Sequence, residues 1–133
     1  MKRTIRVSAA VVTDAAGRAL VVRKTGTIAF MQPGGKPEPG ESAAQALVRE
    51  LAEEIGVSVA EGDLLPMGTF ETDAANEPGH RVIADAFRRE LEPDAARLSG
   101  EIEELRWITS ADVDGIVLAP LSRDLLLPLV WAS

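Results

Sequence analysis

The chain has 133 residues, a formal net charge of −7 and no cysteine. This length suits one compact domain with its own core, and the absence of cysteine excludes disulfides, thiolate chemistry and zinc–cysteine sites. The negative charge argues against a nucleic acid or an anionic membrane as the main partner, because proteins of those classes carry a basic surface. A small polyanionic substrate is compatible with this charge if bound cations supply positive charge locally.

The N-terminal part predicts strands joined by short turns. Residues 4–13 suit a strand, residues 14–17 a turn, and residues 19–24 a second strand. Residues 28–32 predict another short strand before a Pro-Gly-Gly loop. The basic start and the apolar run after it imitate a signal peptide, but the run is short and alternates. We therefore expect a cytoplasmic protein without a membrane segment.

A helix with three carboxylates on one side follows the loop. Ser42 is its expected N-cap, and Gly56 is expected to end it. At about 100° per residue, Glu50, Glu53 and Glu54 share an arc of roughly 100°. The adjoining apolar stripe consists of Ala44, Leu47, Leu51 and Ile55. Because carboxylates at this spacing repel one another, we expect a hard divalent cation, Mg²⁺ or Mn²⁺, to bind there.

The rest of the chain predicts further strands and a closing helix. Extended segments are expected at residues 57–60, 64–72, 80–91 and 101–108. Residues 73–79 are turn-rich and form the best candidate for a substrate-side loop. Pro120 and Ser122 suit the start of the last helix, with Pro128 near its end. Together these elements predict an α+β fold, in which a mixed sheet lies between helices.

The loop and the first helix also contain a specific spacing of residues. Its members are Gly35, Glu41, Arg49, Glu50, Leu51, Glu53, Glu54, Gly56 and Val57. They match every defined position of the Nudix box, and a chance match at a given start is on the order of one in 10⁹ if each residue type has a frequency of about 7%. The chain therefore resembles the Nudix hydrolases. This resemblance implies that residues 1–133 form a single Nudix hydrolase domain, an α/β/α sandwich with a mixed central sheet.

The resemblance implies roles for the residues of the box. Glu50, Glu53 and Glu54 would ligate Mg²⁺, or alternatively Mn²⁺, and the carbonyl group of Gly35 would join them. Arg49 precedes Glu53 by one helical turn and is expected to orient a carboxylate through a charge-assisted fork.

Three further residues are expected to support this site. Glu41 would tie the loop to the start of the helix and hold the metal-binding carboxylates in place. Gly34 would permit a tight loop, and Gly56 suits a left-handed C-cap.

The implied reaction is the hydrolysis of a nucleoside diphosphate linked to another group. Its general base is open among Glu50, Glu54, Glu103 and Glu104. Glu104 is the preferred loop carboxylate because it lies three residues before Trp107. The alternative for Glu103 and Glu104 is that they are ordinary exposed charges.

Two cations and two aromatic residues are candidates for binding the nucleotide. Arg23 and Lys36 are the best candidates for contacting phosphate, and the alternative for each is ordinary surface charge. Phe30 and Phe70 flank loops where a nucleoside would sit, and packing in the core is the alternative for both.

The substrate class follows by elimination among the subfamilies. Thr72 stands where sequences that resemble ADP-ribose hydrolases carry proline. Sequences that resemble dinucleoside polyphosphate hydrolases carry a tyrosine slightly further on, and this chain has no tyrosine. The arginine motif of the coenzyme A type is also missing. The chain is most similar to the MutT-like group, which acts on nucleoside triphosphates or modified nucleotides. Guanine-reading members of this group use an asparagine or aspartate near the last helix. The only asparagine of this chain is Asn76, so Asp112, Asp114 or Asp124 would have to serve.

An alternative function remains open. The domain could be catalytically idle and serve as a nucleotide sensor or an interaction module. The family resemblance also makes a homodimer possible.

Overall fold

A computed structural model describes residues 3–74 and 79–132. Its strands are β1 (Arg3–Thr13), β2 (Ala19–Lys24), β3 (Gly34–Gly35), β4 (Leu65–Asp73), β5 (His80–Glu90) and β6 (Ile102–Ile108). Its α-helices are α1 (Ala43–Ile55) and α2 (Leu127–Trp131). Its 3₁₀ turns are η1 (Glu61–Asp63), η2 (Pro93–Ala95) and η3 (Ser110–Gly115), and a π-helical segment is η4 (Leu121–Leu126).

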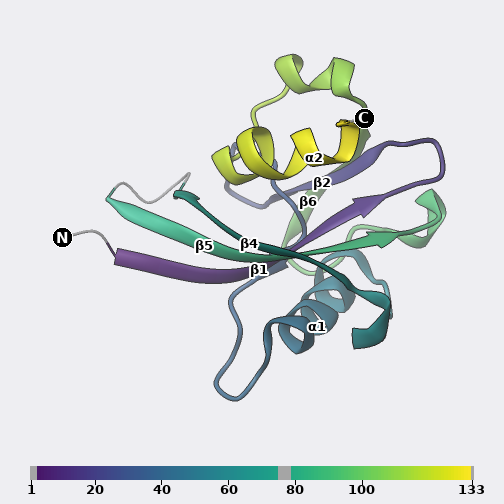
Figure 1. Cartoon of the computed structure of the whole chain (residues 1–133). Coiled ribbons are helices and arrows are strands. Elements are labelled where there is room, and N and C mark those ends of the chain that lie inside the picture. Colours follow the sequence, from purple (N-terminus) through teal and green to yellow (C-terminus); the bar gives the residue numbers. More distant parts are fainter. Residues whose placement is uncertain (1–2, 75–78, 133) are drawn as a thin grey trace.

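The strands form one mixed sheet in the order β4-β5-β1-β2-β6, with β3 paired to β1 off this path. The pair β1–β5 is parallel, whereas β1–β2, β2–β6 and β4–β5 are antiparallel. Figure 1 shows α1 on one side of this sheet and α2 on the other. This arrangement confirms the predicted α+β fold with a mixed central sheet.

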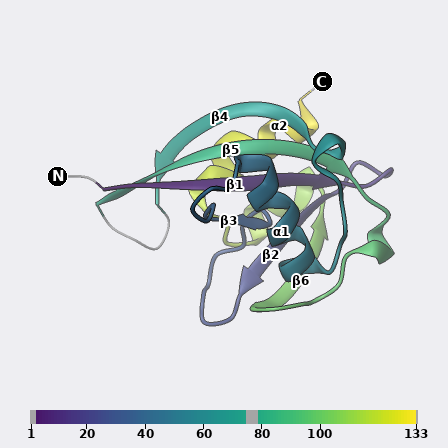
Figure 2. The ribbon, with the colours of Figure 1, turned by 90° about the horizontal axis from the view of Figure 1, so that it is seen from below.

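The helix α1 has the predicted ends. Ser42 accepts a hydrogen bond from the backbone N–H of Gln45, and the Gln45 side chain accepts one from the backbone N–H of Ser42. Gly56 ends the helix at a φ of 67°, a left-handed conformation that costs glycine little. The apolar stripe of α1 is buried against β1, β2 and β6, and this core includes Leu47, Leu51, Ile55, Ala10, Val12, Leu20, Val22 and Ile102. Figure 2 shows α1 lying across the strands from this side.

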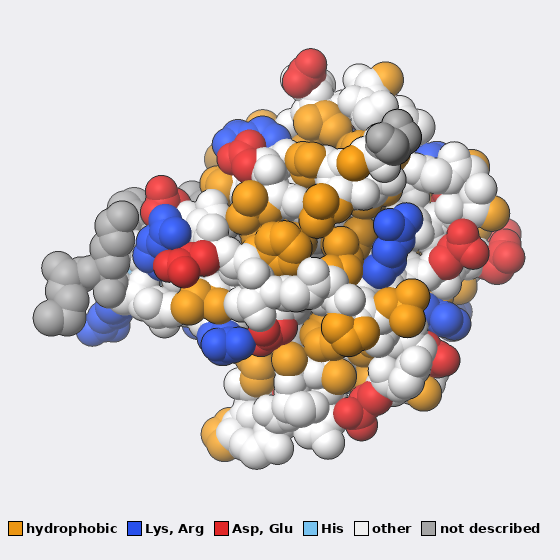
Figure 3. Space-filling model, viewed as in Figure 1, with side chains coloured by type: hydrophobic (Ala, Val, Ile, Leu, Met, Phe, Trp, Pro, Cys, Tyr) orange, Lys and Arg blue, Asp and Glu red, His pale blue; other side chains and the backbone are white. Residues whose placement is uncertain are grey.

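The second side of the sheet is covered by η4 and α2. Their buried contacts include Ala9, Val11, Ala86, Leu126, Ala19, Val21, Ile108 and Leu127. The indole N–H of Trp131 donates to the carbonyl oxygen of Gly17 at 2.8 Å, so α2 is tied to the turn between β1 and β2. Figure 3 shows hydrophobic side chains gathered around α2 and the sheet below it.

Two predicted strands are wrong. Residues 28–32 contain only isolated bridges, Met31 to Val22 and Phe30 to Leu118. Pro33 follows them and has no N–H with which to continue a ladder. Residues 57–60 leave the αL cap of α1 and lead into η1 without pairing.

The closing helix begins near Pro120, as predicted, but changes its geometry along its length. The backbone N–H of Leu127 bonds to the carbonyl oxygen of Ser122, a wide turn. Pro128 comes next and has no N–H for the carbonyl group of Asp124, which gives a physical reason for a wide turn here. The predicted loop at residues 73–79 includes residues 75–78, which lie outside the described residues.

Candidate active site

The glycine pair brings the backbone of β3 against β1 and α1. The carbonyl oxygen of Pro33 accepts a hydrogen bond from Ala10 at 2.8 Å, which fixes the loop beside β1. A Cβ atom on Gly34 would clash with the carbonyl oxygen of Ser8. On Gly35 it would lie 2.7–2.9 Å from the carboxylate atoms of Glu50. Only residues without a side chain therefore allow the loop to lie this close to the carboxylate.

Arg49 holds the loop and the helix together. Its guanidinium forks onto Glu41, with Nε to Oε2 at 2.9 Å and Nη2 to Oε1 at 2.8 Å. Nη1 donates to Glu50 Oε1 at 2.6 Å, and Nη2 donates to the carbonyl oxygen of Lys36 at 3.2 Å. The hydrogen bonds that Glu41 accepts from Arg49, and then the one from the backbone N–H of Glu38, lower the pKa of Glu41 to about 2.

The guanidinium of Arg49 thus forks onto Glu41. Its spacing in the sequence had suggested Glu53, one helical turn further along. Glu53, one turn further along α1, is 3.5 Å away as an ion pair, and its side chain is 58% exposed. Arg49 orients Glu50 directly, through one hydrogen bond.

Glu54 is a buried carboxylate, only 6% exposed. Its Oε1 accepts a hydrogen bond from the N–H of Gly34 at 3.0 Å, and its Oε2 lies 3.6 Å from Lys24 Nζ. Burial raises the pKa of Glu54 to about 7, and the nearby carboxylate of Glu50 also raises it. A nearby cation would favour the ionised form of such a group.

Part of the oxygen donor set that a divalent cation requires is present on α1. Glu50 and Glu54 interact directly and supply hard oxygen atoms next to the Gly35 backbone. Glu53 is 58% exposed and lies 3.5 Å from the Arg49 Nη1 atom that also contacts Glu50. Within residues 3–74 and 79–132, no group of three acidic, histidine or cysteine side chains is arranged around a metal position. The carboxylates of Glu50 and Glu54 fit Mg²⁺ or Mn²⁺ chemically.

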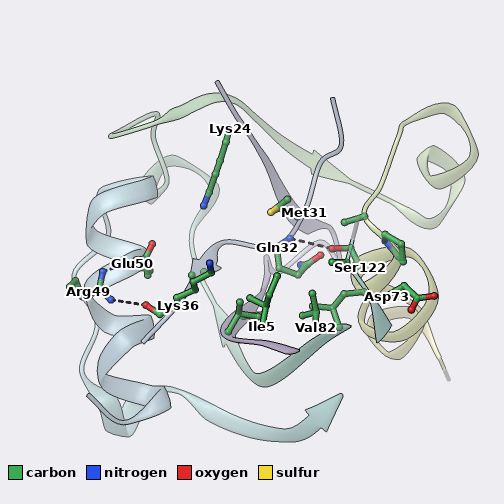
Figure 4. Close-up of a pocket in the computed structure, with 18 of the residues that line it drawn as sticks. Ile5, Lys24, Met31, Gln32, Lys36, Arg49, Glu50, Asp73, Val82 and Ser122 are labelled. Atoms are coloured by element: carbon green, nitrogen blue, oxygen red, sulfur yellow. Dashed lines mark hydrogen bonds and ion pairs between the residues drawn. The ribbon is translucent and has the colours of Figure 1, made fainter. Parts of the chain in front are cut away.

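A cavity of about 470 Å³ opens beside these carboxylates. One end is charged and is lined by Lys24, Lys36, Glu38, Arg49 and Glu50. The other end is mostly apolar and is lined by Ile5, Val7, Ala9, Met31, Val82 and Leu121. Figure 4 shows Arg49 and Glu50 on α1 at one side of this cavity and Ser122 at the other. A ligand with an anionic end and an apolar end matches this division.

Several candidate residues do not line the cavity as described. They include the binding candidates Arg23, Phe30 and Phe70, the candidate base Glu104, and Glu53 and Glu54 of the box. Arg23 donates to Glu104 Oε1 at 2.8 Å and to the carbonyl oxygen of Thr27 at 2.9 Å. Hydrogen bonds from Arg23 and Arg106 lower the pKa of Glu104.

The two aromatic candidates have packing neighbours. Phe30 is buried, and the guanidinium groups of Arg23 and Arg106 lie 5.9 and 5.0 Å from its ring centroid. Phe70 packs against the core under η4. The structure therefore brings Lys36 to the cavity but leaves the other three binding candidates outside it.

Among the cavity residues that the sequence did not indicate as binding candidates are Lys24, Gln32 and Ser122. Lys24 was visible only as the last residue of a strand. Gln32 lies in an apolar stretch directly before the Pro-Gly-Gly loop, and a lone amide there was the one available signal. Ser122 is far away in sequence, and its hydroxyl accepts the backbone N–H of Gln32 at 3.2 Å.

Comparisons with known proteins extend the resemblance along the chain. The family model of the Nudix domain matches residues 2–127. An 8-oxo-dGTP diphosphatase from Haemophilus influenzae is 35% identical over 74 residues, which cover 53% of this chain and 54% of that protein. The chain thus spans about half the length of this curated relative.

Solved structures show the same fold. The MutT protein from Methanosarcina mazei Go1 has a TM-score of 0.74 and 25% identity, with coverage of 95% of this chain and 92% of that one. Another match is a bifunctional NMN adenylyltransferase/ADP ribose pyrophosphatase from Francisella tularensis, complexed with AMP and a manganese ion. Its TM-score is 0.73 at 19% identity, and the match covers 97% of this chain and 42% of that one.

No helix within the described residues is both long and apolar enough to cross a membrane. The spacing of the box, the mixed sheet and the family match over residues 2–127 agree with one another. The chain belongs to the Nudix family.

Proposed function

We propose that this protein hydrolyses a nucleoside diphosphate linked to another group, with a nucleoside triphosphate or a modified nucleotide as its substrate. The observation that carries the proposal is the position of Glu50 at the charged end of a 470 Å³ cavity, in contact with buried Glu54. The cavity continues into an apolar section suited to a nucleoside. The proposal assigns residues 1–133 to one catalytic domain.

The proposed cofactor is Mg²⁺, with Mn²⁺ as a substitute, held by Glu50, Glu53, Glu54 and the carbonyl group of Gly35. When bound, it supplies charge neutralisation for the phosphates and lowers the pKa of a water molecule. Lys24 and Lys36 lie at the same end of the cavity and add positive charge for the phosphates. Glu41 and Arg49 keep Glu50 oriented, and Gly34 donates to Glu54.

The proposed general base is Glu54. Its buried carboxyl group lies beside Glu50, next to the proposed metal. Its pKa of about 7 belongs to the metal-free protein, and a bound cation would favour the ionised form that can accept a proton. Glu104 is less suited to this role because Arg23 and Arg106 hold its pKa below the ordinary value.

Two comparisons support the substrate class. The Haemophilus influenzae relative is named for acting on 8-oxo-dGTP, and the Francisella tularensis structure holds AMP and manganese. Both facts belong to those proteins, and the proposal takes from them a nucleotide substrate and a divalent cation. Action in the cytoplasm and a homodimeric state are further parts of the proposal, with no nucleic acid or membrane as a partner.

Turnover of a nucleotide panel tests the proposal. The panel contains nucleoside triphosphates, oxidised guanine nucleotides, ADP-ribose, nucleotide sugars and dinucleoside polyphosphates, each with Mg²⁺ and with a chelator, and mass spectrometry identifies the products. We expect Mg²⁺-dependent conversion of one class to a nucleotide and a phosphorylated remainder. Thermal stabilisation by one nucleotide without any turnover would instead support a catalytically idle sensor.

A further inference from the structure

Gln32 has a buried side-chain amide whose oxygen atom is unpaired. The side chain is among the buried polar ones, at 5% exposure. Its backbone N–H donates to Ser122 Oγ at 3.2 Å, and Nε2 donates to the carbonyl oxygen of Leu20 at 3.4 Å. Within residues 3–74 and 79–132, Oε1 has no hydrogen-bond partner, and it has almost no accessible surface in the unliganded protein. Buried amide oxygens are usually paired, so this one requires an explanation.

The orientation of the amide follows from its neighbour. If the oxygen and nitrogen atoms of the Gln32 side chain exchanged places, the oxygen would face the Leu20 carbonyl oxygen, and two acceptors would oppose each other. The contact with Leu20 therefore assigns Nε2 to that position and leaves the acceptor unpaired. A purely structural link to Leu20 would need only the N–H group.

Gln32 also lines the cavity that Glu50 of the box lines. Figure 4 shows Gln32 between Met31 and Ile5, with Ser122 beside it and with Lys36 and Glu50 further towards α1. A nucleotide whose phosphates lie at the end of Lys36 and Glu50 would direct its base towards this amide. This step rests on the proposed function.

We propose that Gln32 is a specificity-determining residue whose side-chain amide turns towards the bound nucleotide, so that Oε1 accepts a hydrogen bond from the exocyclic amino group of the substrate's nucleobase. Such an amine projects beyond the ring and carries N–H groups. An amide oxygen can only accept a hydrogen bond, so its partner must be a donor of this kind. The ring N–H of uracil is flanked by carbonyl oxygens, which would approach the same acceptor. The preferred base is therefore adenine, guanine or cytosine, which carry an exocyclic amine that uracil, thymine and hypoxanthine lack.

Removing the amine from the base tests this contact. The substrates are ATP with purine riboside triphosphate, GTP with inosine triphosphate, and CTP with the triphosphate of pyrimidin-2-one riboside. The enzymes are wild type, Gln32→Met, and Gln45→Met as a control that makes the same exchange on exposed α1 surface. For the best substrate of wild type, loss of the amine should lower kcat/KM by about 10-fold or more. In Gln32→Met the two partners should be turned over alike, whereas Gln45→Met should discriminate as wild type does.

The result that overturns the inference is equal use of amino and amino-free bases by wild type. An equal loss for every substrate in Gln32→Met would also overturn it, because that pattern marks a structural role. If wild type hydrolyses no nucleotide, the proposed function fails, and calorimetric binding of the corresponding nucleoside diphosphates decides the inference separately. Binding that needs both the amine and Gln32 would sustain it, and binding without this dependence would overturn it.

Discussion

Glu54 connects the electrostatics of the site with the stability of the protein. In the folded protein its pKa is about 7, against an ordinary value of 4.5, because the carboxyl group is buried. Between these two values the folded state keeps a proton that the unfolded state has lost. The free energy of unfolding of the metal-free protein should therefore fall as pH rises from about 4.5 to 7, and stay lowered above that range.

Glu54→Gln should remove this pH dependence, because the amide does not titrate. The measurement is urea titration in the presence of a chelator at pH 5 and pH 8. We expect the difference in free energy of unfolding, variant minus wild type, to be larger at pH 8 than at pH 5 by on the order of 1–3 kcal/mol. The matched control is Glu61→Gln, at an exposed position in η1. An unchanged slope in Glu54→Gln would show that Glu54 titrates as an ordinary carboxyl group in the folded protein.

Arg49 is expected to need its planar fork. Arg49→Lys keeps the positive charge but cannot make two parallel hydrogen bonds to Glu41 while also bonding Glu50. Turnover of the best nucleotide should fall by about 10- to 100-fold, as is usual when the support of metal ligands is disturbed. Arg6→Lys, at the exposed fork with Asp85, is the control and should keep wild-type rates. Equal rates for both variants would contradict the role given to Arg49.

At the scale of elements, the close approach of β3 to α1 depends on Gly35. Gly35→Ala would place a Cβ atom 2.7–2.9 Å from the Glu50 carboxylate atoms, so that side chain must move. We expect a loss of turnover of about 10-fold or more with the fold retained, as judged by circular dichroism. Gly62→Ala, with no atom within 4 Å of its new Cβ, should be neutral. Full activity in Gly35→Ala would show that the position of Glu50 is not critical.

The capping box of α1 should contribute measurably to stability. Ser42→Ala removes the acceptor for the Gln45 N–H, and should lower the free energy of unfolding by about 1 kcal/mol. Urea titration of the variant against Ser58→Ala, an exposed serine outside the helices and strands, measures this difference. The same loss in both variants would remove the cap as the cause.

The elements themselves show what could be predicted from the sequence. The limits of α1 followed from local chemistry, because Ser42 and Gly56 act within one turn of the helix ends. The strand predicted at residues 28–32 failed because bridging there depends on partners elsewhere in the chain, Val22 and Leu118. The pairing of β2 with β6 is equally non-local, so the pairing of Arg23 with Glu104 was not visible in the spacing.

At the scale of the whole molecule, the cavity is assembled from distant segments. Strand β1, the loop before β3, helix α1 and segment η4 each supply part of its wall. The box could be recognised from the sequence because its residues lie in one continuous stretch. Gln32 and Ser122 could not be joined, because they lie 90 residues apart and meet only when η4 packs on the sheet.

The central claim is that the box carboxylates act together on a nucleotide through a divalent cation. The most direct measurement is kcat for the best nucleotide of the panel at saturating Mg²⁺, in wild type, Glu53→Gln and the control Glu61→Gln. Glu53 lies at the surface of α1 and its only described ion pair is with Arg49, so the variant should fold normally. We predict a loss of at least about 100-fold in Glu53→Gln and none in Glu61→Gln. Wild-type rates in Glu53→Gln would contradict the account.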